Sequence, residues 1–199
     1  MQGQGTDSAA ETGLRDRKKA RTRETIRTAA LDLFEEQGFE GTTVDQICRR
    51  ADVAHRTFFR YYPSKEALLF GWDFGNVILD AFAAAPADLA PWAALEHALI
   101  ATGGRMEEPA EHTARRRALR LRFLGIRTVH DHALILVDSF AQRAVVIAGQ
   151  RLGVDPATDL RPQVLGTALG GLIRRHIMVG SEEGLLAAWT AALRELTAP

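Results

Sequence analysis

The side chains best suited to binding chemistry gather in one short stretch, HRTFFRYYPSK, at residues 55–65. It combines cations, hydroxyls and aromatic rings, which can bind phosphates and the edges of bases. Elsewhere the sequence has no nucleotide-binding glycine loop, no HExxH, no GxSxG and no Cys/His pair arranged for nucleophilic attack. The stretch therefore favours nucleic-acid recognition over catalysis, and we expect neither an enzyme nor a cofactor.

Two short helices and a turn are predicted to position this stretch. Thr43 and Gln46 form a capping-box pattern, and a stripe of small and apolar residues follows from Val44 to Ala51. A turn at residues 51–54 leads to a second helix from His55 to about Tyr61. This is the layout of a helix-turn-helix DNA reader.

The second helix of the pair is predicted to bury one face and present the other. Phe58 and Tyr62 lie four residues apart and can face the core, which leaves the opposite face for a ligand. Arg56 can bind guanine through two hydrogen bonds, and Phe59 is suited to the methyl group of thymine. The residues expected in the first, base-reading turn are Ala54, His55, Arg56 and Thr57.

Charge is unevenly distributed along the chain. The 199 residues include 25 basic and 25 acidic side chains, so the net charge is zero. The segment from Arg15 to Arg27 is nevertheless mostly basic, and it precedes an apolar helical stripe that ends at Gly38. Its basic side chains, Arg17, Lys18, Lys19 and Arg21, either contact DNA or are merely solvated. Residues 1–14 are polar and read as a disordered tail.

The rest of the chain reads as helices. We expect one helix from Ser64 to about Ala85, and further helices at 91–103, 109–128, 129–152, 156–179 and 182–196. Asp155 and Pro156 look like a cap and first residue, and Ser181 looks like the cap of the last helix. The fold class is therefore all-α, with a DNA-binding domain at 15–63 and a larger helical domain at 64–199.

Residues 21–69 resemble the DNA-binding domain of the TetR-type bacterial transcriptional regulators. The matching pieces are ALDLFEEQGFEGTTVDQIC, the turn ADVA and TFFRYYPSKEALL. Thr43, Tyr61 and Lys65 match family positions that touch the DNA backbone, whereas Asp52, Arg56 and Phe59 depart from the common glycine, glycine and tyrosine. The resemblance implies a homodimer on a palindromic double-stranded operator, usually as a repressor, released by a small-molecule effector in the C-terminal body.

The C-terminal body offers candidate effector and dimer residues. Ligand-lining candidates are Trp72, Trp92, His97, Phe123, Arg127, Phe140 and His176, although bulky residues of this kind are more often core. Arginines at 115, 116, 117, 120 and 122 suggest a solvated face or, alternatively, a site for an anionic effector. A small-residue helix with Leu165, Leu169, Leu172 and Ile173 is the expected dimer interface, with packing inside the chain as the alternative. His130 and His132 would splay apart on a helix, so no metal site is expected.

The remaining features point to a cytoplasmic protein. Cys48 is the single cysteine, which excludes an internal disulfide and suggests a small core residue. The N-terminus lacks the apolar segment of a signal peptide, and we see no apolar run of membrane-spanning length. The competing interpretation is a helical protein-interaction or small-molecule-binding protein without specific DNA binding.

Overall fold

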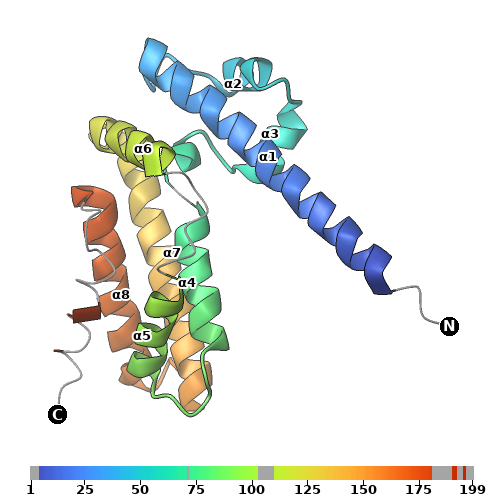
Figure 1. The fold of residues 1–199 in the computed structure, drawn as a ribbon. Helices are drawn as coiled ribbons and strands as arrows, with labels where there is room; N and C mark the ends of the chain where they lie inside the picture. Colours follow the sequence, from blue (N-terminus) through green and yellow to red (C-terminus); the bar gives the residue numbers. More distant parts are fainter. Residues whose placement is uncertain (1–4, 71, 103–109, 181–189, 192–194, 196–199) are drawn as a thin grey trace. The chain divides into compact units, whose positions relative to one another are not determined.

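The computed structural model describes residues 5–70, 72–102, 110–180, 190–191 and 195, and its regular elements there are all helices (Figure 1). The chain divides into two compact units, Met1–Leu69 and Phe70–Pro199. The predicted all-α fold class is confirmed. The first unit ends at Leu69, whereas the sequence suggested a boundary at Pro63, because the buried Leu68 and Leu69 belong to the core that α1 covers.

Unit 1 holds three α-helices and a short 3₁₀-helix. Their bounds are α1 Gly5–Gln37, α2 Val44–Arg50, α3 His55–Tyr61 and η1 Glu66–Leu69. The predicted bounds of α3 are confirmed. The helix expected from Arg15 instead begins at Gly5, so residues 5–14 are helical rather than a disordered tail. Residues 5–14 contain no proline to stop the helix from extending.

The core of unit 1 lies where α1, α2, α3 and η1 meet. The apolar stripe predicted on α1 is buried, with Ile26 and Phe34 fully covered. Ile47 from α2 and Phe58 from α3 are equally covered. Gly38, at which the sequence predicted the apolar stripe to end, follows α1 with φ +80°, a left-handed cap. Phe39 then folds back so that its ring centroid lies 5.1 Å from that of Phe34.

The helix expected over residues 64–85 is in fact two elements. The 3₁₀-helix η1 ends at Leu69, and α4 begins at Trp72 and ends at Ala84. Gly71 separates the two in the sequence, and glycine disfavours the helix interior by about 0.5–1 kcal/mol relative to alanine. The prediction of one continuous helix over residues 64–85 is therefore wrong.

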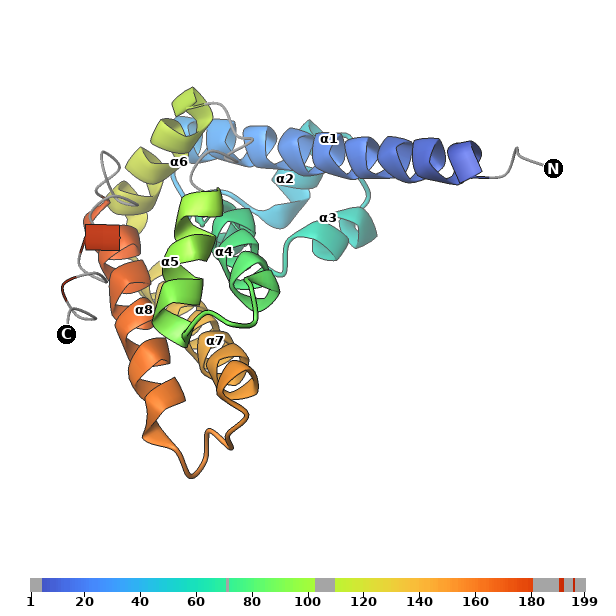
Figure 2. The same cartoon turned by 60° about the horizontal axis from the view of Figure 1, so that its bottom comes forward.

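Unit 2 is built around α7. The helices are α4 Trp72–Ala84, α5 Pro91–Thr102, α6 Ala110–Phe123, α7 Arg127–Leu152 and α8 Leu160–Val179. Helices α8, α4 and α5 all contact α7, and both views show them side by side (Figures 1 and 2). The contact between α7 and α8 is very close: a Cβ built on Gly166 would lie 2.3 Å from Val145 Cγ2 and 2.8 Å from the Ala141 carbonyl oxygen.

Helix α8 begins later than predicted. Asp159 is its cap, and its Oδ1 accepts a hydrogen bond of 2.9 Å from the backbone N–H of Arg161. The prediction that Asp155 and Pro156 start this helix is wrong, because Asp155 Oδ1 instead accepts from Ala157 N within a separate turn. Ser181 and nearly all of the helix expected at 182–196 lie outside the described residues.

Helix α7 is also long and apolar enough, by length and composition alone, to cross a membrane, which inspection of the sequence did not pick out. Its buried side chains, among them Val129, Phe140 and Ala148, belong instead to the core of unit 2. A core helix of a helical bundle has the same composition.

Candidate nucleic-acid interface

Helix α2 is held at its start by the predicted capping box. Thr43 Oγ1 accepts from Gln46 N at 3.2 Å, and Gln46 Oε1 accepts from Thr43 N at 2.8 Å. Gln37 of α1 donates to the same Gln46 oxygen at 3.0 Å, so the end of α1 and the start of α2 are tied together. Thr43 itself is exposed. The predicted phosphate-contacting residue therefore sits on a fixed, accessible corner.

The turn between α2 and α3 depends on one left-handed residue. Asp52 has φ 51°, a conformation that aspartate tolerates better than most residues, and it stands where the family commonly has glycine. Asp52 does not cap α3: the N-cap is Ala54, and in the described part of the chain no side chain caps α3. The turn is closed instead by a backbone bond from Val53 N to Cys48 O of 3.0 Å.

Helix α3 separates its faces as predicted. Phe58 is fully buried and Tyr62 nearly so, and the Tyr62 hydroxyl donates to the Arg23 carbonyl oxygen of α1 at 3.2 Å. The other face is open to solvent: His55, Arg56 and Arg60 are exposed, and Phe59 is 54% exposed. Thr57 is half-buried, and Ala54 just before the helix is exposed.

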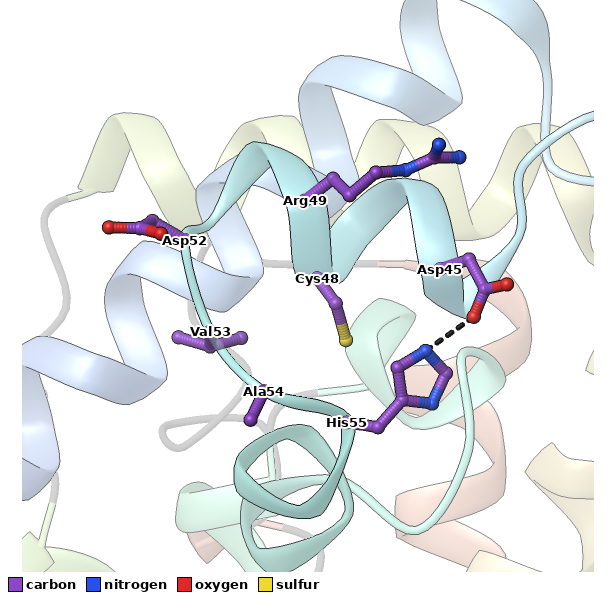
Figure 3. A pocket seen from close by; sticks show the side chains of 7 residues that line it. All are labelled: Asp45, Cys48, Arg49, Asp52, Val53, Ala54 and His55. Carbon is purple, nitrogen blue, oxygen red and sulfur yellow. Dashed lines mark ion pairs between the residues drawn. The ribbon is translucent and has the colours of Figure 1, made fainter.

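A shallow pocket lies between α2 and α3, and Figure 3 shows the seven side chains that line it. Across it, His55 Nε2 forms an ion pair with Asp45 Oδ1, so the first residue of α3 is tied to the first turn of α2. The Cys48 side chain points into the space between the two helices. Burial raises the pKa of the Cys48 thiol, and the nearby Asp45 adds to this, so the thiol is a core group as the sequence suggested.

Lys65 is hydrogen-bonded to the backbone of unit 1, which a residue that only contacts DNA phosphate would not need. Its Nζ donates to the carbonyl oxygens of Phe39 and Thr42, both at 2.8 Å, and lies 4.3 Å from the centroid of the Phe39 ring. Burial lowers the pKa of Lys65, against the opposing effect of Glu66 and Glu40. Lys65 thus clamps the segment that joins α1 to α2.

Sequence reasoning missed a cationic cluster around Tyr61. The guanidinium of Arg60 lies 4.9 Å from the Tyr61 ring centroid, and that of Arg23 lies 5.8 Å from the same centroid. Arg60 was a foreseeable member because it adjoins Tyr61. Arg23 comes from α1, and only the tertiary fold brings it to α3. Of the N-terminal cations, Arg17, Lys18, Lys19 and Arg21 are exposed.

The predicted effector residues do not form one enclosed set. Phe123 and Phe140 are buried, and Phe140 lies against α4, where a Cβ on Gly75 would be 2.6 Å from its ring. His97 is exposed, and the side chain of Arg127 is 93% exposed. Trp92 and His176 are half-buried, and the side chain of Trp72 lies outside the described ones. Among the described residues, no group of three His, Cys, Asp or Glu is arranged to hold a metal ion.

The arginines of α6 do not form a solvated face. Arg116 and Arg120 are buried, and Arg120 Nε donates to the Ile177 carbonyl oxygen at 3.2 Å, near the end of α8. That end carries the negative pole of the helix dipole, which favours a cation. The burial of Arg116 and Arg120 therefore contradicts the prediction that these arginines form a solvated face.

The small-residue face of α8 serves packing inside the chain. Leu165, Leu169 and Ile173 are buried, on the side where Gly166 and Gly170 approach α7, and Leu172 is half-buried. Glycine at these positions lets the two helices approach closely. The exposed residues of α8 are others: Leu160, Arg161, Val164, Thr167, Gly171, Arg174, Arg175 and Val179.

Comparisons with known proteins agree with this geometry. The family described as "Bacterial regulatory proteins, tetR family" matches residues 26–71. The HTH-type transcriptional regulator TcmR of Streptomyces glaucescens is 33% identical over 199 residues, covering 92% of this chain and 86% of that protein. A putative mycofactocin biosynthesis transcriptional regulator of Mycobacterium tuberculosis, MftR, is 44% identical over 60 residues, 30% of each chain. A solved regulator from Aquifex aeolicus has a TM-score of 0.47 at 21% identity, covering 87% of this chain and 96% of that one.

Proposed function

The chain belongs to the TetR family of bacterial transcriptional regulators and is a DNA-binding regulator, and we propose that the exposed face of α3 reads its operator. Members of this family bind operator DNA as homodimers and respond to small-molecule effectors. The protein is therefore a regulator and not an enzyme. Its partners are a palindromic operator, a second copy of itself and an effector.

One observation carries the assignment of the reading surface. Helix α3 buries Phe58 completely while it leaves Arg56 exposed, and among the described residues Arg56 has no hydrogen-bond or ion-pair partner. An unengaged guanidinium on a helix that is anchored from behind can enter the major groove without first breaking a contact within the protein. Ala54 and Thr57 flank it, and His55 is held by Asp45. Repression follows when such a complex blocks transcription.

Phosphate contacts are proposed on both sides of α3. Thr43 offers a hydroxyl at the start of α2, and Tyr61 offers one beside the guanidinium groups of Arg60 and Arg23. Such contacts fix the register of the protein on DNA without reading sequence. Lys65 contributes chiefly by holding the segment at Phe39 and Thr42 in place.

The dimer surface is proposed on the outward faces of α8 and α7. The large apolar side chains exposed on the two helices are Leu160, Val164 and Val179 of α8 and Ile135 and Val146 of α7. We propose this surface in place of the leucine face predicted from the sequence, because α8 packs that face against α7 of the same chain. A regulator that binds operator DNA must be in the same compartment as that DNA, so we also propose a cytoplasmic location.

Binding to the region upstream of the protein's own gene tests the function. The full-length protein should bind one fragment with an affinity that falls steeply as salt rises, and it should protect a palindromic segment. Random DNA of the same length is the control. Equal affinity for both fragments at every salt concentration would contradict a sequence-specific regulator.

Arg56→Ala tests the reading surface itself. We expect a loss of discrimination of roughly 1–3 kcal/mol at one base pair per half-site, because a two-bond contact to guanine disappears, with little change on random DNA. Competition binding with operators substituted one base pair at a time measures this. Lys18→Ala, which removes an exposed cation of α1, is the matched control and should leave the order of preferred bases unchanged.

A further inference from the structure

Phe59 is an aromatic side chain on an otherwise polar surface. Among the described side chains of unit 1, it is the one large apolar group that is exposed, at 54%. Its ring lies edge-on to Phe58 with centroids 5.2 Å apart, and the His55 ring lies 6.2 Å away on its other side. Phe58 is fully buried and His55 is paired with Asp45, so the Phe59 ring lies against two side chains that have partners of their own within unit 1.

The chemistry of the ring limits what it can meet. A phenyl group makes no conventional hydrogen bond, so a phosphate oxygen or a polar base edge pressed against it would lose water without replacement. In the major groove the four base pairs present donors, acceptors and one apolar group, the 5-methyl of thymine. We propose that Phe59 selects a thymine in each operator half-site through this methyl group. This inference rests on the proposed reading surface.

The position of the thymine follows from the helix. Arg56 and Phe59 are three residues apart, so they are neighbours on one face of α3, about 4.5 Å apart along its axis. Successive base pairs are about 3.4 Å apart along the DNA. The thymine should therefore lie within one or two base pairs of the guanine that Arg56 contacts. The exposed Arg60 on the same helix places cationic charge beside the ring and favours docking of the whole face on DNA.

The test begins with full-length protein and a pool of random duplexes, from which the bound operators are enriched and sequenced. Each thymine of the consensus is then replaced by deoxyuridine, which removes the methyl group and nothing else. For the unaltered protein, replacing one particular thymine in a single half-site should weaken binding about fourfold, the effect of one buried methyl group. For Phe59→Ala the same replacement should change affinity less than twofold.

Further variants separate the methyl contact from general damage. Phe59→Leu keeps an apolar side chain and should retain a smaller preference for thymine over deoxyuridine. Replacing the same thymine by 5-methylcytosine should give tighter binding than cytosine for the unaltered protein, and the two should be equal for Phe59→Ala.

Two failures have different meanings. If no duplex is enriched, the proposed function fails and the inference fails with it. If operators are enriched but no deoxyuridine replacement distinguishes the unaltered protein from Phe59→Ala, the reading surface survives and the methyl contact is overturned. The methyl contact is also overturned if a half-site has no thymine within two base pairs of the position at which Arg56→Ala loses its base preference.

Discussion

The two units depart from the usual rule of apolar inside and charged outside in opposite directions. Unit 1 exposes an aromatic ring, Phe59, on α3, the helix that we propose reads DNA. Unit 2 buries two arginines of α6, Arg116 and Arg120, and Arg120 donates to a carbonyl near the end of α8. An exposed ring that packs against a buried one indicates a surface awaiting a partner. A buried arginine bonded to a helix-end carbonyl indicates packing between helices.

The largest effect should come from the anchor of α3. Phe58→Ala should lower the free energy of unfolding by about 3–5 kcal/mol, because it leaves a cavity where a fully covered ring was, and DNA binding should be lost with it. Chemical denaturation followed by circular dichroism measures this. The neighbouring Phe59→Ala is the control and should lower the free energy of unfolding much less, by about 0.5–1.5 kcal/mol, because it loses only the edge contact with Phe58. Similar losses of stability for Phe58→Ala and Phe59→Ala would contradict the division of α3 into a buried and an exposed face.

The clamp at Lys65 tests whether a cation in unit 1 can be structural, as those in unit 2 are. Lys65→Met keeps the aliphatic stem but leaves the Phe39 and Thr42 carbonyls without their donor. We expect a loss of about 1–3 kcal/mol in the free energy of unfolding and weaker binding to all DNA sequences alike. Lys18→Met, on an exposed part of α1, should leave thermal unfolding unchanged. If Lys65→Met leaves the midpoint of unfolding unchanged, Lys65 does not stabilise the fold, and a contact with DNA phosphate becomes the better explanation of this residue.

Two glycines of α8 sharpen the description of unit 2. Gly166→Ala places a Cβ against Val145 and the Ala141 carbonyl, so it should cost about 1–3 kcal/mol of stability. Gly171→Ala meets nothing within 4 Å and should stabilise the helix by about 0.5–1 kcal/mol in the monomeric chain. Thermal unfolding at low protein concentration compares them. If Gly171→Ala impairs dimerisation, the outward face of α8 is also closely packed in the dimer.

The smallest effect concerns the cap of α8. The hydrogen bonds from Arg161 lower the pKa of Asp159 from 3.8 to about 2. Because the folded pKa is the lower one, the carboxylate stabilises the fold above about pH 4, and this contribution is lost as the pH falls through 2. The difference in melting temperature between the unaltered protein and Asp159→Ala should therefore shrink between pH 4 and pH 2. A difference that stays constant would show that charge is not involved, and Asp159→Asn supplies that uncharged reference.

The sequence predicted unit 1 better than unit 2 for a physical reason. Thr43, Gln46 and the spacing of Phe58 and Tyr62 are local signals, and short-range capping and periodicity placed them correctly. Which face of α8 turns inward is decided by packing against a separate helix, α7, and not by residues of α8 itself. Leucines and valines occupy both faces of α8, so periodicity alone could not choose between them. The clamp at Lys65 and the approach of Arg23 to Tyr61 join distant segments.

The buried Cys48 gives the protein a built-in reporter. It is the single thiol of the chain, it is buried between α2 and α3, and burial raises its pKa, so a thiol reagent should modify it slowly in the folded protein. Movement of α2 away from α3 would expose the thiol and should speed its modification. The labelling rate would read out the opening of the DNA-reading element directly, and its slowing by operator or by effector would show which of them holds that element shut.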